Sequence, residues 1–287
     1  MSLKDRRLCT MAALLLAGAP PALAQADNTN SIHWAYSTYF GSGWYRIGAQ
    51  RDAFALRFAP RKVVREASIG DEGQAVSGAE VRFPVTVGLD QFPLNDLAGT
   101  VDLGNLANVS FTPGVYFDIP VNTRWSLRPF AAAGWGTVLD GGESAWSYWA
   151  GLRSRRLLGR GNVRTALVNS AGFVGYSPSN GSSANFWPVM TAVELSHPLV
   201  ALAGGDELRL DWHLAYTFFA ADFDVLARDA ASDPIADQWE LGLAVSRRER
   251  RMNLWFFTFE RVGLAFRTSS DGKLKGIGLV FHSLYDQ

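Results

Sequence analysis

An acid and a histidine two positions apart are the residues in this sequence whose spacing could support catalysis. Asp211 and His213 share one face of an alternating segment, and Arg209 lies on the same face just before them. A carboxylate can orient a histidine that acts as a general base, and a Ser or Thr from a neighbouring strand could complete a triad. The alternative is a network of ion pairs, which we favour because charged groups inside a fold need partners. We therefore assign no catalytic residue.

The other histidines and the single cysteine do not suggest a metal site. His33, His197 and His282 are scattered, and they show no metal-ligand spacing with cysteine or carboxylates. Cys9 lies ahead of the apolar part of an N-terminal leader, so the chain after that leader has no cysteine. We predict no metal and no cofactor.

The elements that hold these residues are predicted to be β-strands, because apolar side chains recur at every second position in segment after segment. The alternating segments are 81–89, 107–119, 124–135, 146–152, 187–195, 208–218, 239–245, 262–266 and 277–281, while 162–176 alternates less cleanly. Several reach the length that a tilted strand needs to cross a bilayer. With a first pair at 43–49 and 53–59, the pattern predicts an all-β, transmembrane, antiparallel up-and-down β-barrel of about twelve strands.

Connection lengths give a topology for this barrel. Transmembrane barrels keep periplasmic turns short and external loops long. Counting back from a last strand at 274–284, we predict external connections at 90–106, 139–143, 177–186, 222–235 and 269–273. The predicted periplasmic connections are 119–123, 155–161, 198–205 and 248–251. Residues 60–78 do not fit this rule, since they would form a long periplasmic segment.

If the apolar faces of the strands meet lipid, the opposite faces meet a polar lumen. This assigns twelve lumen-lining candidates: Glu80, Arg82, Arg124, Arg128, Arg164, Glu194, Arg209, Asp211, His213, Glu240, Arg261 and Arg267. A soluble β-sandwich would also alternate, with its apolar faces forming a dry core. The strand lengths and the long tandem run of strands favour the barrel.

The first 24 residues are predicted to be a cleaved signal peptide. They hold a basic start at 4–7, an apolar stretch at 11–17 and the small-residue cleavage site Ala22-Leu23-Ala24. An anchoring helix is disfavoured because Pro20 and Pro21 break a stretch that is already short. Residues 25–42 would form an N-terminal segment that plugs the lumen or adds a strand, and residues 43–287 the barrel.

Composition excludes two other classes of protein. After the leader, the sequence has no run of about 20 apolar residues, which a membrane-spanning helix requires. The 27 basic residues are balanced by 27 acidic ones. Because phosphate binding needs a basic surplus, we expect no nucleic-acid partner.

The C-terminal third resembles a known family. The runs Trp239–Val245, Arg261–Phe266 and Asp271–Phe281 are similar to the ending of solitary autotransporter-like outer-membrane barrels. The resemblance implies a translocator-type barrel of about twelve strands without a large passenger, and it implies no settled biochemical activity. One departure is that such chains usually end on an aromatic residue read by the insertion machinery, whereas Tyr285 is followed by Asp286 and Gln287.

A second resemblance concerns catalysis. The segment from Tyr176 to Gly181 is similar to the His-x-Ser-Asn-Gly signature of outer-membrane phospholipase A, but Ser177 stands where the histidine should be. A serine cannot accept the hydroxyl proton near neutral pH. Since Pro, Ser, Asn and Gly form turns, we predict a turn here.

Two functions remain open from the sequence. The first is a structural or passive barrel in the bacterial outer membrane, which could form a narrow channel whose arginine-rich lumen favours anions. The alternative is an outer-membrane lipid hydrolase, of phospholipase or lipid A deacylase type, with an unrecognised triad. The expected partners are outer-membrane lipid, lipopolysaccharide and the barrel insertion machinery, and we expect a monomer.

Overall fold

The computed structural model of the chain describes residues 39, 41–47, 51–70, 74–90, 106–139, 144–159, 161–179, 183–201, 207–223, 235–247, 252–254 and 257–287. The predicted signal peptide and nearly all of segment 25–42 lie outside these residues. No helix within the described part of the chain is long and apolar enough to cross a membrane.

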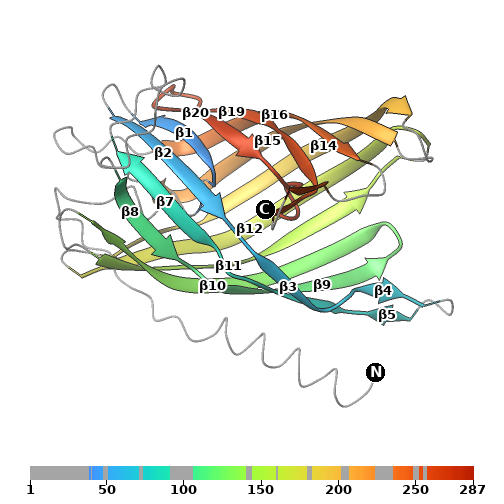
Figure 1. Cartoon of the computed structure of the whole chain (residues 1–287), viewed down its shortest axis with the longest axis horizontal. Helices are drawn as coiled ribbons and strands as arrows, with labels where there is room; N and C mark the ends of the chain where they lie inside the picture. The colour runs from blue at the N-terminus through green and yellow to red at the C-terminus, as the bar shows by residue number, and fades with distance from the viewer. Residues whose placement is uncertain are drawn as a thin grey trace, which may run out of the picture.

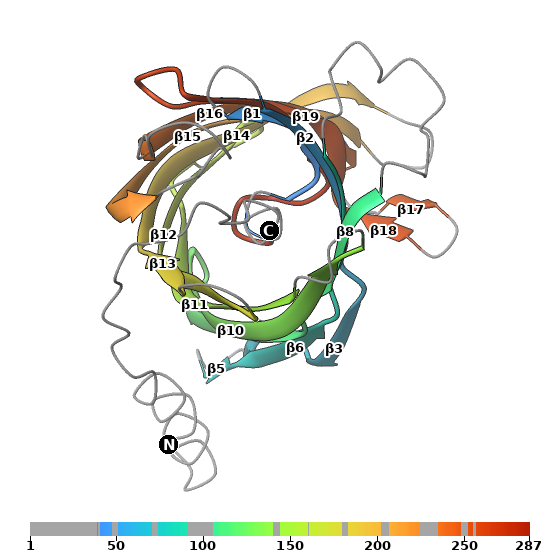
Figure 2. The ribbon, with the colours of Figure 1, turned by 90° about the vertical axis from the view of Figure 1, so that its left-hand side faces the viewer.

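Twelve antiparallel strands form a closed ring, which Figure 1 shows from the side and Figure 2 along its axis. In order around the ring, they begin with β1 (Gly43–Ile47), β2 (Arg51–Phe58), β7 (Val85–Asp90), β8 (Leu106–Phe111), β10 (Trp125–Val138) and β11 (Ser144–Leu157). They continue with β12 (Arg164–Pro178), β14 (Pro188–Ala201), β15 (Glu207–Phe223), β16 (Ile235–Arg247), β19 (Arg261–Thr268) and β20 (Leu274–Val280). Pairing of β20 with β1, with Gly278 opposite Gly43, closes the ring. The predicted up-and-down barrel is confirmed.

Three neighbouring strands of the ring are each split by a proline. β2 continues as β3 (Arg61–Arg65), β7 is preceded by β6 (Gly78–Arg82), and β8 continues as β9 (Gly114–Asn122). Proline has no backbone N–H, so each strand loses one donor at Pro60, Pro84 or Pro113. The proline carbonyls still accept hydrogen bonds, from the N–H groups of Phe83 at 2.8 Å, Thr112 at 3.0 Å and Ala133 at 3.1 Å respectively. The three prolines therefore lie side by side in a row across the barrel wall.

This proline row corrects the prediction for residues 60–78. They are not a long periplasmic connection, because residues 61–65 and 78–82 are barrel strands that pair with each other. Only a small hairpin of β4 (Ser68–Ile69) and β5 (Ala75–Val76) joins them. The segment 107–119, predicted as one strand, is likewise β8 followed by β9. The prolines interrupt strands that the alternation alone could not follow across the break.

The other connections fall at the two ends of the barrel as predicted from their order. Residues 90–106, 139–143, 177–186, 222–235 and 269–273 join strands at the end that also holds the β1–β2 turn, which we call end A. The opposite end, called end B, carries the β4–β5 hairpin and the turn between β9 and β10. Two connections contain extra strands: β13 (Ala184–Phe186) pairs with β12, and β17 (Met252–Leu254) pairs with β18 (Phe257–Phe259).

The barrel has an apolar outside and a polar inside. On β16 the burial alternates from Gln238 onward: Trp239 is 42% exposed and Leu241 53% exposed, while Glu240 between them is 6% exposed. Other large outward side chains are Leu56, Phe111, Leu152, Val189, Leu214, Phe218, Val262, Leu264, Phe266 and Leu279. Such a surface is costly in water and is favourable against lipid chains.

Tryptophans gather on the outer surface near end A. Trp135, Trp146, Trp187 and Trp239 are all exposed, and Trp135 lies directly opposite Trp146 on the neighbouring strand. Trp125 occupies an exposed position at the start of β10, near end B. Aromatic residues at these two levels are typical of the membrane–water interfaces of transmembrane barrels.

Candidate functional site

Most of the predicted lumen residues point into the barrel. Glu80, Arg82, Arg128, Glu194, Arg209, Asp211, His213, Glu240 and Arg267 are all buried, and the side chain of Arg261 is 15% exposed. Arg124 and Arg164 are exposed and do not belong to the buried interior. Arg124 lies in the turn between β9 and β10, and Arg164 is the first residue of β12. At both positions the alternating sequence pattern continues beyond the part of the barrel that encloses the buried interior.

His213 is part of an ion-pair network that crosses three strands. Its Nε2 lies 2.8 Å from Oε1 of Glu240. Arg267 donates from Nε to the other oxygen of Glu240 at 2.6 Å and from Nη1 to the hydroxyl of Tyr45 at 2.9 Å. Gly242 makes room for the histidine, since a Cβ there would lie 2.1 Å from Cε1 of His213. Both oxygens of the carboxylate are therefore engaged.

Asp211 does not orient His213, although the two residues share a strand face. Its carboxylate lies 3.8 Å from Nε of Arg261, which also approaches Glu194 at 3.5 Å. The acidic partner of His213 comes instead from the neighbouring strand. The arrangement is the ion-pair network that the sequence favoured over a triad.

The phospholipase-like segment shows no base next to its serine. Ser179, at the serine position of the signature, accepts a hydrogen bond from the backbone N–H of Ser144 at 3.3 Å. Ser177, at the histidine position, lies near the end of β12, and its hydroxyl hydrogen-bonds the hydroxyl of Ser183 at 2.8 Å. Within the described residues, no histidine hydrogen-bonds either serine. Asn180 and Gly181 lie outside the described residues.

The segment Phe281–Gln287 turns inward after β20 and occupies the lumen (Figure 2). We call it the inner segment. Leu284 is 2% exposed and Tyr285 3% exposed, and both pack in one cluster with Val168, Ala192 and Ala215 of the wall. The backbone N–H of Leu284 donates to the carboxylate of Glu194 at 2.9 Å.

Arg128 holds the inner segment from β10. Its Nε and Nη2 form a two-pronged hydrogen bond to Asp118 at 2.7 and 2.8 Å. Its Nη1 donates to the carbonyl of Tyr285 at 3.1 Å and to the carboxylate of Asp286. The guanidinium also lies 4.4 Å from the ring centre of Tyr285, in cation–π geometry.

Two further arginines contact the end of the inner segment. Arg82 donates to the carbonyl oxygens of Asp286 at 2.6 Å and Gln287 at 3.1 Å, and Arg153 also donates to the oxygen of Gln287. Burial by itself raises the pKa of Asp286, but the charges of Arg128 and Arg82 outweigh burial and hold this pKa well below its ordinary value. The inner segment is thus bound as an anion.

His282 is the other titratable group at this place. Burial, assisted by the charges of Arg61 and Arg82, lowers the pKa of His282 to about 4. Its Nδ1 lies 3.9 Å from Glu260, which also accepts a hydrogen bond from Arg61 at 3.0 Å. Near neutral pH the histidine is therefore uncharged.

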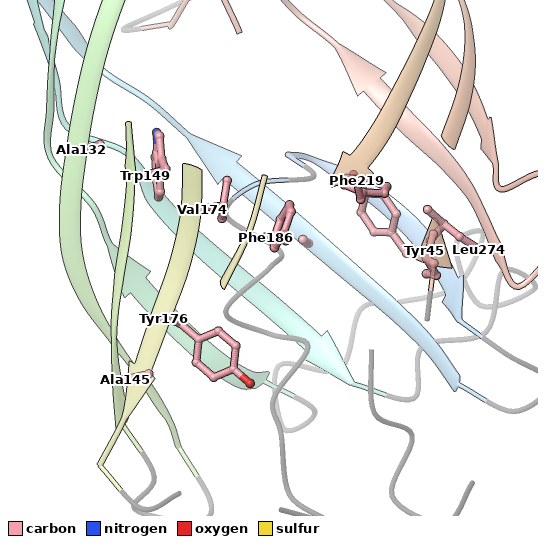
Figure 3. Close-up of a cluster of buried hydrophobic side chains, with 11 residues drawn as sticks. Tyr45, Ala132, Ala145, Trp149, Val174, Tyr176, Phe186, Phe219 and Leu274 are labelled. Atoms are coloured by element: carbon pink, nitrogen blue, oxygen red, sulfur yellow. The ribbon is translucent and has the colours of Figure 1, made fainter. Parts of the chain in front are cut away.

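Towards end A, an apolar cluster of buried side chains packs inside the barrel (Figure 3). Phe186, Ile235 and Leu274 are fully buried there, and the ring of Phe186 packs edge-on against Phe219 with centres 5.5 Å apart. Tyr39 packs against Phe186 in the same way at 5.3 Å. Tyr39 belongs to the predicted segment 25–42, and it is the one residue of that segment before Gly41 that the structure describes.

A chamber of about 630 Å³ is reached by both the inner segment and the apolar cluster. Its wall includes Arg57, Arg153, Tyr116, Phe130 and Trp149, and Asp286 and Gln287 of the inner segment also line it. No group of three His, Cys, Asp or Glu residues that could hold a metal ion occurs among the described residues.

Comparisons with known proteins give three similar solved structures. No family model matches the chain, and no curated protein matches it. Similar solved structures include the β domain of the Bordetella autotransporter BrkA, with a TM-score of 0.49 and 12% identity over 83% of this chain and 91% of that one. Another is the transport unit of the autotransporter AIDA-I from Escherichia coli, with a TM-score of 0.45 and 12% identity over 96% and 97%.

A third similar structure is the siderophore receptor PirA from Pseudomonas aeruginosa, with a TM-score of 0.30 and 12% identity over 82% of this chain and 37% of the receptor. Similarity at this level does not assign an activity.

Proposed function

We propose that the chain is an outer-membrane β-barrel of structural or passive-channel type, with a narrow lumen that favours small anions. The observation that carries this proposal is the inverted polarity of the barrel. Apolar side chains cover the outside, while nine of the twelve predicted charged residues are buried inside. A closed ring satisfies all backbone groups between strands, and this is what a sheet in lipid requires. The bacterial outer membrane is the location that such barrels occupy.

Two groups of residues inside the lumen limit the size of what could pass. The apolar cluster narrows end A, and the inner segment occupies part of the space towards end B. Arginines outnumber carboxylates around the chamber, so a cation in transit would meet a less favourable potential than an anion. Only small solutes fit this description.

A planar-bilayer recording of the purified full chain tests the proposal. We expect small steps of conductance. In a KCl gradient, the reversal potential should have the sign of the chloride equilibrium potential. Arg153→Gln should shift that potential towards zero, because it removes a charge from the chamber wall. Arg124→Gln, in the exposed turn between β9 and β10, is the matched control and should leave it unchanged.

Two results would contradict the proposal. Cation preference of the unmodified barrel would mean that the chamber charges do not govern permeation. Failure of the protein to fractionate with membranes, with no change in gel mobility on boiling, would remove the barrel from the membrane altogether.

No described contact favours the alternative of a lipid hydrolase, and we propose a barrel without a catalytic role. An assay of phospholipid and lipid A hydrolysis by the purified protein tests this part independently. Hydrolysis that persists in a Ser179→Ala variant and is lost in His213→Gln would identify His213 as a base and overturn it. We also propose a monomer inserted by the barrel assembly machinery, which native mass spectrometry and depletion of that machinery would test.

A further inference from the structure

Arg57 and Arg153 face the chamber, and neither forms an ion pair with a carboxylate side chain of the described residues. Arg153 donates to an oxygen of Gln287, whereas Arg57 has no such acceptor in the described part of the chain. Arg57 comes from β2 and Arg153 from β11, so they approach the chamber from separate parts of the wall. Because a cation taken out of water needs a compensating charge, this arrangement is costly unless an anion lies nearby.

Buried hydrogen-bond donors without a partner also line this chamber. Nη2 of Arg82 and Nε of Arg57 are buried and have no hydrogen-bond partner. Arg82 as a whole is 4% exposed, and it lines the same chamber. Buried donors of this kind usually bind an acceptor, and every guanidinium N–H can donate to a carboxylate or phosphate oxygen.

The space between these donors is lined by aromatic rings. Arg57 lies 5.6 Å from the ring centre of Trp149, Arg153 lies 4.7 Å from that of Phe130, and Arg82 lies 4.1 Å from that of Tyr116. A guanidinium stacked on a ring keeps its in-plane donors free for an anion. A flat apolar body could then pack on the remaining ring surface.

The volume is also appropriate for a small organic molecule. Ligand pockets are typically between about 300 and 1,000 Å³ and combine apolar walls with a few placed polar groups. The chamber, at about 630 Å³, lies within this range. A hydrated inorganic ion would leave most of the apolar wall without contacts.

We propose that the chamber is a binding site for a small aromatic carboxylate, whose carboxylate pairs with Arg57 and Arg153 while its ring packs among Trp149, Phe130 and Tyr116. The site lies in the lumen of the proposed channel, but binding does not require that any solute crosses the barrel. Occupation would supply the counter-charge that Arg57 lacks.

Calorimetric titration of the purified full chain in detergent micelles tests the site, with benzoate as probe. We expect saturable binding of benzoate, none of benzylamine, and at least about tenfold weaker binding of inorganic phosphate. Arg57→Gln should weaken benzoate binding by at least about tenfold, since it removes a charge-assisted hydrogen bond. Arg57→Lys, which restores the charge, should recover part of the loss, and Arg124→Gln should bind as the unmodified chain does.

The choice of variants separates loss of binding from loss of the fold. Arg57 is preferred to Arg153, because Arg153 also contacts the inner segment. Each variant is first checked for the change of gel mobility on boiling that a folded barrel gives. A folded protein that does not bind benzoate overturns the proposal, as does phosphate binding as tightly as benzoate or benzoate binding unchanged in Arg57→Gln.

These outcomes differ from those that test the channel. Benzoate binding by a barrel that conducts no ions would refute the channel and leave the site intact. Anion-selective conductance without benzoate binding would do the reverse.

Discussion

Removal of Arg128 should release the inner segment from the lumen. When the inner segment leaves, Arg128 keeps its two-pronged contact with Asp118, so this contact does not count towards the seating energy. What is lost is the ion pair with Asp286, the hydrogen bond to Tyr285 and the cation–π contact. The charge-assisted hydrogen bonds are worth about 1.5–3 kcal/mol. The cation–π contact adds about 0.5–1 kcal/mol. Arg128→Gln should therefore weaken seating by about 3 kcal/mol, or about 100-fold.

Thiol labelling measures this release directly. Ser283 is 4% exposed, and Ser283→Cys places a small thiol at that buried position without changing its volume much. With reclosing faster than labelling, the rate reports the population of the released state. A polar maleimide should label Ser283→Cys about 100 times faster in the Arg128→Gln background, while Arg124→Gln should leave the rate unchanged.

The reasoning would be refuted if Arg128→Gln changed the labelling rate by less than about threefold. A contact worth about 3 kcal/mol cannot be lost with so small an effect. Rapid labelling already in the unmodified background would have a different meaning, namely that the inner segment is not seated in the lumen at all.

Three further predictions concern pH, packing and lipid contact. The folded pKa of His282, about 4, lies below its ordinary value of 6.5, so the form with the inner segment seated should be most stable above pH 6.5 and lose stability as pH falls towards 4. The same thiol labelling, with a reagent whose reactivity does not depend on pH, measures this change. His282→Gln should remove the pH dependence. The depressed pKa of Asp286 adds stability that is present above its ordinary value of 3.8 and is lost at still lower pH. Gly242→Ala should lower the free energy of unfolding, measured in urea, by about 1–3 kcal/mol, because its Cβ would clash with His213. Gly278→Ala should change this free energy little, because the nearest atom to its Cβ would be 3.5 Å away. Equal effects of the two substitutions would contradict the packing argument. Leu243→Arg on the outer face should destabilise the barrel in lipid vesicles by about 2–4 kcal/mol and Val121→Arg, near end B, by about 0–1 kcal/mol, and equal costs would argue against lipid contact.

The sequence predicted the barrel because lipid and lumen impose opposite requirements on alternate residues. From Gln238 to Arg247 on β16 this alternation is unbroken, and residues such as Leu241 and Glu240 identify the two faces without any tertiary information. It fails where backbone chemistry overrides side-chain pattern. Pro60 and Pro84 interrupt strands whose pairing continues through their carbonyls, and no count of apolar residues could recover that continuity.

The interior was predicted in composition but not in its contacts. Alternation places Asp211 and His213 on one face, yet it cannot say that the histidine pairs with Glu240 across the strand boundary, because register depends on the whole ring. For the same reason, the sequence did not predict the position of the inner segment. Asp286 finds Arg82 and Arg128 far away in the chain, and a contact of that range leaves no local pattern.

The row of prolines also bears on how the strands find their alignment. A slip of two residues between neighbouring strands returns every side chain to its own face, so polarity alone does not forbid it. Such a slip would bring the ring nitrogen of Pro60, Pro84 or Pro113 opposite a carbonyl that now has a donor. In lipid, an acceptor left without a donor costs several kcal/mol, and there is no water to replace it. The missing N–H groups thus help to fix the strand register: they favour one alignment of three adjacent strands and penalise the alternatives during assembly.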